Sequence, residues 1–160
     1  LDRRLDLARK SGATHTVIAS RGDVKEQIDA LTRNRGVDKS FMCVSAAAAL
    51  PQILDAAADR GSIMLTGSPS GVSSIRLRED ILRKELTITG TYESQMTTPH
   101  PYWQWTRDRN RATILRLLAD DELQLSHLIS QVVPAAKAPD LYANLLKYPD
   151  DYLGVVFDWS

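Results

Sequence analysis

Short apolar or β-branched runs alternate with helical patterns along the first ninety residues, and this alternation constrains the fold more than any other feature. Strand-like runs lie near 15–19, 41–45, 63–67 and 86–91, and helical patterns lie near 2–11, 24–34, 47–60 and 76–84. Successive strands are separated by about 20 to 25 residues, which is the spacing of right-handed βαβ crossovers between parallel strands. The sequence therefore predicts an α/β fold with a parallel sheet and flanking helices.

The run Phe41–Val44 consists of four apolar residues without a polar interruption. Such a run is typical of a parallel strand that is covered on both faces. The helix before it is marked by Asp23, with Glu26 three residues later as the partner of a capping box. Gly36 follows where that helix has to end. These signals favour a buried strand that comes directly after a helix.

The composition of the chain excludes several classes of protein. It has 160 residues, with 20 basic and 20 acidic side chains and a formal net charge of zero, which argues against nucleic acid and anionic membranes as partners. No apolar run reaches the roughly 18 to 20 residues that span a bilayer, and no signal-peptide pattern opens the sequence. The single cysteine, Cys43, forms neither an internal disulfide nor a multi-cysteine metal cage. We therefore expect a cytoplasmic protein.

The sequence changes character after the fourth predicted strand. Residues 97–105 are rich in proline, tryptophan and tyrosine, which is typical of an irregular segment. Helical spacing then predicts a helix over Arg107–Ala119 and another around 139–145, and 153–157 is typical of a final strand. The arginines and aromatic rings of 102–116 also resemble a surface for single-stranded nucleic acid. We favour a solvated helix face, because acidic residues balance these arginines.

In a parallel α/β sheet, ligands lie beyond the carboxyl ends of the strands, so the residues that follow each strand are candidates for a binding site. These residues are Ser45-Ala46, Gly67-Ser68-Pro69 and Gly90-Thr91-Tyr92. Small side chains there would allow a flat ligand to approach the backbone. The same residue types also serve turn geometry in any strand-to-helix loop, so both interpretations are open.

Several motifs that would identify a chemistry are absent from the sequence. No two glycines are separated by a single residue, so the chain lacks the G-x-G-x-x-G pattern of a dinucleotide-binding turn. His15, His100 and His127 are scattered, and no carboxylate cluster has metal-ligand spacing. The sequence therefore predicts no catalytic residue and no metal ligand in this chain.

The order of several short segments carries a resemblance that no single motif carries. These segments are Asp2–His15, Ile28–Thr32 leading to Arg35–Asp38, Asp59–Ile63 leading to Thr66–Gly67, then Gly90–Tyr92, Val133–Pro139 and Leu153–Phe157. Together they resemble the coenzyme domain of the medium-chain dehydrogenase/reductase superfamily, the zinc-type alcohol dehydrogenases. The resemblance covers nearly all of the chain and implies a Rossmann-like parallel sheet.

The resemblance begins after the family's glycine-rich turn and second strand. We therefore expect a fragment that lacks the first two strands of the sheet and the N-terminal catalytic domain. Residues 1–122 would form a partial NAD(P)-binding domain, and residues 123–160 a return segment that in the family packs on the catalytic domain. Zinc would be held only by residues outside this chain. This stretch alone is expected to be inactive and to bind coenzyme weakly, because the turn that cradles the pyrophosphate is missing.

The resemblance assigns coenzyme contacts to Arg4, Cys43, Val44, Ser45, Thr66, Gly67, Ser68, Thr89 and Gly90. Arg4 corresponds to a basic residue near the adenosine ribose, Cys43–Ser45 to the segment beside the adenine, and the others to backbone positions near the nicotinamide. Ser45 stands where the family usually has glycine, and its Cβ would weaken close packing of the coenzyme. Lys39 is a second departure, because an interior strand tolerates lysine only beside an exposed neighbour.

The resemblance implies an oxidoreductase that transfers hydride between NAD or NADP and an alcohol or carbonyl substrate. The alternatives are a truncated, non-catalytic binding or assembly module with the same fold and an unrelated α/β regulator. The resemblance also implies a homodimer, because the family's sixth strand pairs with its twin across the sheet edge. The corresponding segment 86–92 is β-branched and contains no proline or lysine. We expect pairing through 86–92 and not beside 41–45, where Lys39 disfavours it.

Overall fold

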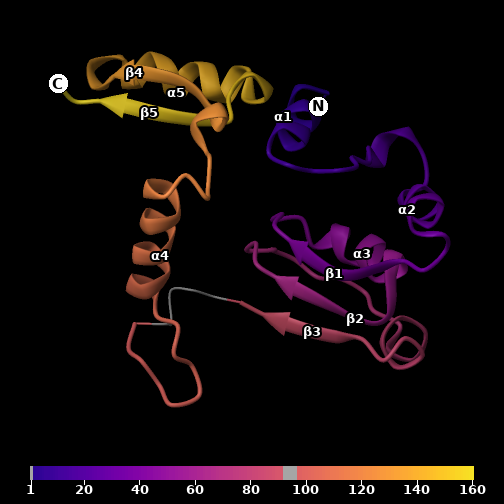
Figure 1. Cartoon of the computed structure of the whole chain (residues 1–160). Coiled ribbons are helices and arrows are strands. Elements are labelled where there is room, and N and C mark those ends of the chain that lie inside the picture. The colour runs from indigo at the N-terminus through magenta and orange to yellow at the C-terminus, as the bar shows by residue number, and fades with distance from the viewer. Residues whose placement is uncertain (1, 92–96) are drawn as a thin grey trace. The chain divides into compact units, whose positions relative to one another are not determined.

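The computed structural model of the chain describes residues 2–91 and 97–160. It confirms the predicted α/β class, with parallel sheets and flanking helices (Figure 1). The chain divides into two compact units, one formed by Val17–Thr106 and the other by Leu1–Thr16 together with Arg107–Ser160. Each unit contains one parallel sheet.

The unit Val17–Thr106 contains a three-stranded sheet in the order β1-β2-β3. Its elements are the 3₁₀ turn η1 (Ala19–Arg21), α2 (Val24–Thr32), β1 (Val37–Met42), the 3₁₀ turn η2 (Ala47–Ala49), α3 (Leu50–Ala56), β2 (Ala57–Leu65), the π-helical turn η3 (Leu77–Leu82) and β3 (Thr87–Gly90). Phe41 is paired with Met64 and Ile63 with Ile88, both in parallel ladders. The prediction that these two strands pair in parallel is therefore confirmed, although the first strand ends at Met42.

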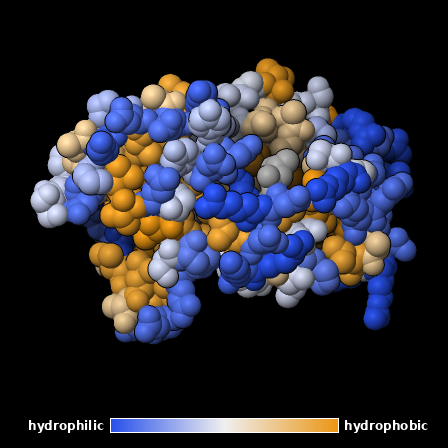
Figure 2. All heavy atoms as spheres, turned by 90° about the horizontal axis from the view of Figure 1, so that it is seen from above, coloured by the Kyte–Doolittle hydropathy of each residue, from blue (hydrophilic) through white to orange (hydrophobic). Residues whose placement is uncertain are grey.

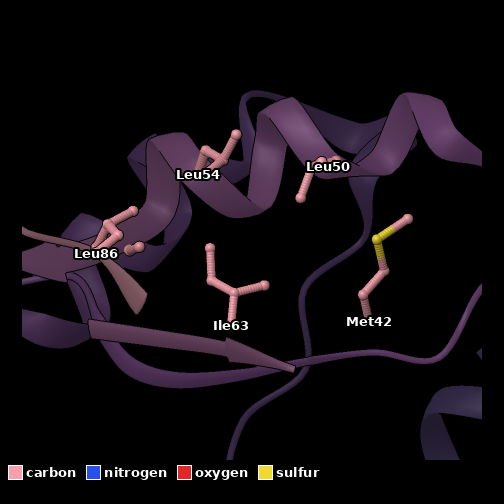
Figure 3. Packing of buried hydrophobic residues seen from close by; sticks show 6 residues of the cluster. Met42, Leu50, Leu54, Ile63 and Leu86 are labelled. Carbon is pink, nitrogen blue, oxygen red and sulfur yellow. The ribbon is translucent and has the colours of Figure 1, made fainter. Parts of the chain in front are cut away.

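One face of this sheet carries the hydrophobic core. Met42, Leu50, Leu54, Ile63 and Leu86 come together from β1, α3, β2 and the residue before β3 (Figure 3). Ile63 is fully buried between the strands and the helix. Removing apolar surface from water stabilises a fold by roughly 25 cal/mol per Å², so this cluster is what holds α3 on the sheet.

Lys84 joins the end of α3 to the segment that leads into β3. Its ammonium group donates hydrogen bonds to the carbonyl oxygens of Leu54, Asp55 and Ala57 at 2.8 to 2.9 Å. The last carbonyls of a helix have no partner within the helix and carry a negative partial charge. Lys84 therefore acts as the C-terminal cap of α3.

The π-helical turn η3 is organised around Asp80, which is 7% exposed. Its carboxylate accepts a hydrogen bond of 2.8 Å from the backbone N–H of Arg76 and a further one from the guanidinium of Arg76. The same guanidinium lies 3.5 Å from the carboxylate of Asp55 at the end of α3. Hydrogen bonds from Arg76 lower the pKa of Asp80, so its contribution to stability is present at neutral pH and is lost as the pH falls through that lowered value.

Two predicted strands differ from the structure. Residues 15–19 do not form a strand, although their β-branched sequence favours one, because no other strand of the described chain lies beside them to accept their backbone hydrogen bonds. The strand predicted at 41–45 instead spans Val37–Met42. It is also not covered on both faces, since Phe41 is 62% exposed at the edge of the sheet while Met42 is buried under α3. Lys39 lies on this edge strand and is exposed.

The helix predicted over 47–60 ends at Ala56, because β2 begins at Ala57 and continues through Gly61. A Cβ at Gly61 would lie 2.9 Å from the carbonyl oxygen of Ala58, so this glycine allows close backbone packing within the sheet. Sequence periodicity alone predicts that Gly61 ends the helix. The helix predicted over 76–84 is confirmed in position, but it forms the shorter π-helical turn η3.

The other unit combines α1 with the C-terminal elements. These are α1 (Asp2–Lys10), α4 (Arg107–Ala119), the 3₁₀ turn η5 (Ser126–Leu128), β4 (Ile129–Pro134), the 3₁₀ turn η6 (Ala135–Lys137), α5 (Ala138–Lys147), the 3₁₀ turn η7 (Pro149–Asp151) and β5 (Gly154–Asp158). β4 and β5 form a parallel pair, and Tyr142 of α5 packs against Phe157 of β5. The hydroxyl of Ser11 lies 2.6 Å from His127 Nε2, which ties the end of α1 to η5. The division between 1–122 and 123–160 stays a prediction.

The surface of the protein mixes hydrophilic side chains with several hydrophobic patches (Figure 2). Large apolar side chains such as Val72, Leu146 and Trp159 are more than four fifths exposed. None of the helices in the described ranges has the length and apolar content needed to cross a lipid bilayer.

We expect Lys84→Met to lower the free energy of unfolding by about 2 kcal/mol, because the carbonyl groups at the end of α3 lose a charged donor while the apolar stem is kept. Chemical denaturation of the two proteins measures the difference. The matched control is Lys10→Met, an exposed lysine at the end of α1, which should change the stability by less than about 0.5 kcal/mol. Equal effects of the two substitutions would contradict the proposed cap.

Candidate functional site

The carboxyl ends of β1, β2 and β3 lie at one edge of the sheet, because the three strands run parallel. Cys43–Ser45 follow β1, Thr66–Ser68 follow β2, and Thr89–Gly90 end β3. The structure therefore brings together every residue of the predicted coenzyme set except Arg4. All of these residues are exposed apart from the half-buried Gly67, so a ligand has access to the edge.

A hydrogen-bond cluster fixes the ends of β1 and β2 to each other. The carbonyl oxygen of Met42 accepts from the backbone N–H groups of Thr66 and Gly67 at 3.2 and 2.7 Å. It also accepts from the hydroxyl of Thr66 at 3.1 Å. Because that hydroxyl has one hydrogen, the thiol of Cys43, whose Sγ lies 3.1 Å away, donates to Thr66 Oγ1. Cys43 is thus an exposed thiol held at the edge.

Gly67 and Gly90 both lie at this edge, but backbone packing requires glycine only at the first of these positions. A Cβ at Gly67 would lie 2.6 Å from the carbonyl oxygen of Val44 and 2.9 Å from its nitrogen, so the fold itself requires glycine there. A Cβ at Gly90 would have no heavy atom within 4 Å. Gly90 therefore leaves open space above the end of β3, where a ligand can approach the backbone.

The loop after β2 is tied back across the edge. The N–H of Ser70 donates to the carbonyl oxygen of Ser45 at 3.0 Å, next to an isolated parallel bridge between Ala46 and Ser70. Sequence reasoning did not identify Ser70, and no side-chain signal marks it, because its backbone makes the bond. At the end of β3, the N–H and hydroxyl of Thr91 both donate to the carbonyl oxygen of Leu65 at 3.1 Å.

Arg4 belongs to the other unit. Its guanidinium donates to the carbonyl oxygen of Pro149 at 3.2 Å and lies 3.8 Å from the carboxylate of Asp150. These contacts tie α1 to the turn η7. The role of Arg4 in coenzyme binding stays a prediction, and Tyr92, the last residue of the predicted Gly90-Thr91-Tyr92 group, lies outside the described residues.

The edge carries no charged side chain at residues 43–45, 66–68 or 89–91. It therefore offers backbone groups, hydroxyls and small apolar surfaces, which suit uncharged rings and sugar hydroxyls. Within residues 2–91 and 97–160, no group of three or more His, Cys, Asp or Glu side chains could hold a metal ion. The donor set of the described chain consequently does not fit a zinc site.

The sequence of this chain is similar to the sequences of known proteins. A family model described as zinc-binding dehydrogenase matches residues 1–108. L-threonine 3-dehydrogenase from Bacillus velezensis is 37% identical over 89 residues, which are 56% of this chain and 26% of that protein. Sorbitol dehydrogenase from Bacillus subtilis is 25% identical over 154 residues, which are 96% of this chain and 40% of that protein. The chain thus spans well under half the length of these curated relatives.

Solved structures share the fold. Benzyl alcohol dehydrogenase from Acinetobacter calcoaceticus superposes with a TM-score of 0.80 at 19% identity, over 100% of this chain and 41% of that one. Zinc dependent alcohol dehydrogenase 2 from Streptococcus pneumonia gives the same TM-score at 20% identity, over 100% of this chain and 43% of that one. Likeness at this level of identity concerns the fold alone.

We expect Gly67→Ala to lower the free energy of unfolding by about 2 kcal/mol, because its Cβ would displace the backbone of Val44. Gly90→Ala is the matched control and should leave the stability unchanged or slightly raised, since its Cβ meets open space. Thermal or chemical unfolding compares the two variants. A control that loses as much stability as Gly67→Ala would show that the two glycines do not differ in this way.

Proposed function

The chain belongs to the zinc-binding dehydrogenase family of the medium-chain dehydrogenase/reductase superfamily, and from this premise we propose that it binds the coenzyme in an NAD(P)-dependent dehydrogenase acting on an alcohol or carbonyl substrate. The observation that carries the proposal is the exposed, uncharged carboxyl edge at Cys43–Ser45, Thr66–Ser68 and Thr89–Gly90. Two relatives are named for threonine and sorbitol, and both compounds carry hydroxyl groups. This supports an alcohol as the substrate.

When bound, the nicotinamide coenzyme supplies the chemistry of accepting or donating a hydride. The residues of this chain bind and orient it. Gly90 leaves room for a ring to lie against the backbone at the end of β3, and Val44, which is 47% exposed, offers apolar surface at the end of β1. The cluster around the carbonyl oxygen of Met42 keeps the two strand ends in register. This part of the chain thus positions the reacting ring.

No zinc-dependent step is assigned to the described residues, because their side chains do not form a metal site. A zinc ion that polarises a substrate oxygen would be held by other residues. The alternative is a non-catalytic binding or assembly module with the same fold. Coenzyme binding by the complete protein separates the two functions.

We expect Gly90→Val to weaken binding of NADH or NADPH by the complete protein at least tenfold, because the added side chain fills the space above β3 without meeting protein atoms. The control is Ala30→Val, which adds bulk at an exposed position of α2 in the same unit. Isothermal titration with each nucleotide measures affinity and shows which of the two is preferred. Equal affinity in both variants would contradict the proposed site, and a complete protein that binds neither nucleotide would favour the non-catalytic module.

We also propose that two copies of the protein pair through β3. β3 forms one edge of the sheet, and the N–H of Thr91 points to Leu65 of β2. Backbone groups alternate along a strand, so those of Ile88 face away from β2 and are available to another chain. Within the segment 86–92 that the sequence singled out, Leu86 is buried in the core and Tyr92 lies outside the described residues.

We expect Ile88→Pro to convert a dimer of the complete protein into a monomer, because proline removes the N–H that faces the open edge. Ile88→Ala is the control: it loses the same side chain, which packs partly on the core, but keeps the N–H. Light scattering at matched concentrations measures the mass of each variant. A dimer that persists in Ile88→Pro would exclude this interface, and dissociation of both variants would trace the effect to the side chain instead.

A further inference from the structure

Three polar residues follow the last paired residues of the three-stranded sheet. The strands end in one row across the sheet, because Met42 pairs with Leu65 and Leu65 pairs with Gly90 in parallel register. These three residues end β1, β2 and β3 at the same edge (Figure 1). The residues that come directly after them are Cys43, Thr66 and Thr91.

The two threonines make the same pair of hydrogen bonds. Thr66 donates from its N–H and from its hydroxyl to the carbonyl oxygen of Met42, at 3.2 and 3.1 Å. Thr91 donates from the same two groups to the carbonyl oxygen of Leu65, both at 3.1 Å. Each threonine therefore binds the last carbonyl group of the neighbouring strand with two donors.

These bonds determine which part of each threonine a ligand can reach. A hydroxyl has a single hydrogen, so donation to the backbone leaves none for a ligand. At Thr66 the thiol of Cys43 also occupies a lone pair of the oxygen. Both threonine residues are nevertheless exposed. Because each oxygen is turned toward the neighbouring strand, the methyl group is the part of the side chain that is free to contact a ligand.

The position of each methyl group is fixed in advance. Threonine is branched at Cβ, so a bond that holds its oxygen also holds its methyl group. A group that is ordered before binding costs less entropy when a ligand arrives. Gly90, which precedes Thr91, leaves open space beside it. Two ordered methyl groups next to this space offer an apolar surface to a flat ring.

We propose that Thr66 and Thr91 contact the coenzyme ring through their methyl groups, while their hydroxyl groups hold those methyl groups in place. This adds Thr91 to the candidate site. The inference rests on the proposed coenzyme-binding function. It assigns coenzyme affinity and protein stability to different atoms of the same side chain, so the two properties can be separated by substitution.

Serine and valine separate the two groups at each position, since serine keeps only the hydroxyl and valine replaces it with a second methyl group. In the complete protein, we expect Thr66→Ser and Thr91→Ser each to weaken NADH binding roughly fourfold, the effect of one methyl group removed from an apolar contact. Thr66→Val and Thr91→Val should keep the affinity but unfold at a lower temperature, because a carbonyl group loses a donor. Isothermal titration and thermal unfolding measure the two properties, with NADPH titrated in parallel.

The matched control is Thr87, an exposed threonine at the other end of β3. Thr87→Ser and Thr87→Val should bind coenzyme like the unmodified protein. The inference is overturned if the valine variants of Thr66 and Thr91 lose affinity while the serine variants keep it, because the hydroxyl groups would then be the contact. It is also overturned if all four variants bind like those of Thr87. An unmodified protein that binds neither nucleotide overturns the proposed function, and this inference with it.

Discussion

The packing of α3 against β1 and β2 is the interaction on which the candidate site depends. Leu54 and Ile63 are buried in this contact. Lys84 caps the same helix. Arg76 forms an ion pair with Asp55 at the end of that helix, so both residues attach later segments of the chain to it. These contacts fix where β2 and β3 begin. Parallel pairing then determines where the strands end, so the carboxyl edge follows from interactions at the opposite end of the sheet.

The edge itself is built by the backbone more than by side chains. The carbonyl oxygen of Met42 collects three hydrogen bonds, and Gly67 permits an approach to Val44 that any Cβ would prevent. A site of this kind recognises shape and hydrogen-bonding groups instead of charge. It is suited to hold a ring in a fixed orientation, as the proposed coenzyme site requires.

An element is predicted well from sequence when the residues that determine it lie within the element itself. Helices such as Asp2–Lys10 and Arg107–Ala119 are predicted well, because spacing and flanking residues within each segment determine them. Strands are harder to predict, because a strand forms only beside a partner that can lie far away in the sequence. The strand Ile129–Pro134 is not predicted from sequence, and β5 supplies its partner. The strand predicted at 15–19 does not form, because no strand of the described chain pairs with it. The residues of the candidate site that follow the strands are predicted from the strand topology. The hydrogen bond from Ser70 to Ser45 is not predicted, because it joins two backbone groups and does not depend on the side chains.

Hydrogen–deuterium exchange of the complete protein with and without nicotinamide coenzyme tests most directly whether the carboxyl edge holds the coenzyme. Slower exchange on adding coenzyme is expected at 43–46, 66–70 and 89–91, with η3 unchanged as the reference within the same unit. Protection that leaves these three segments unaffected, or that is no greater there than in η3, would contradict the assignment of this edge as the coenzyme site.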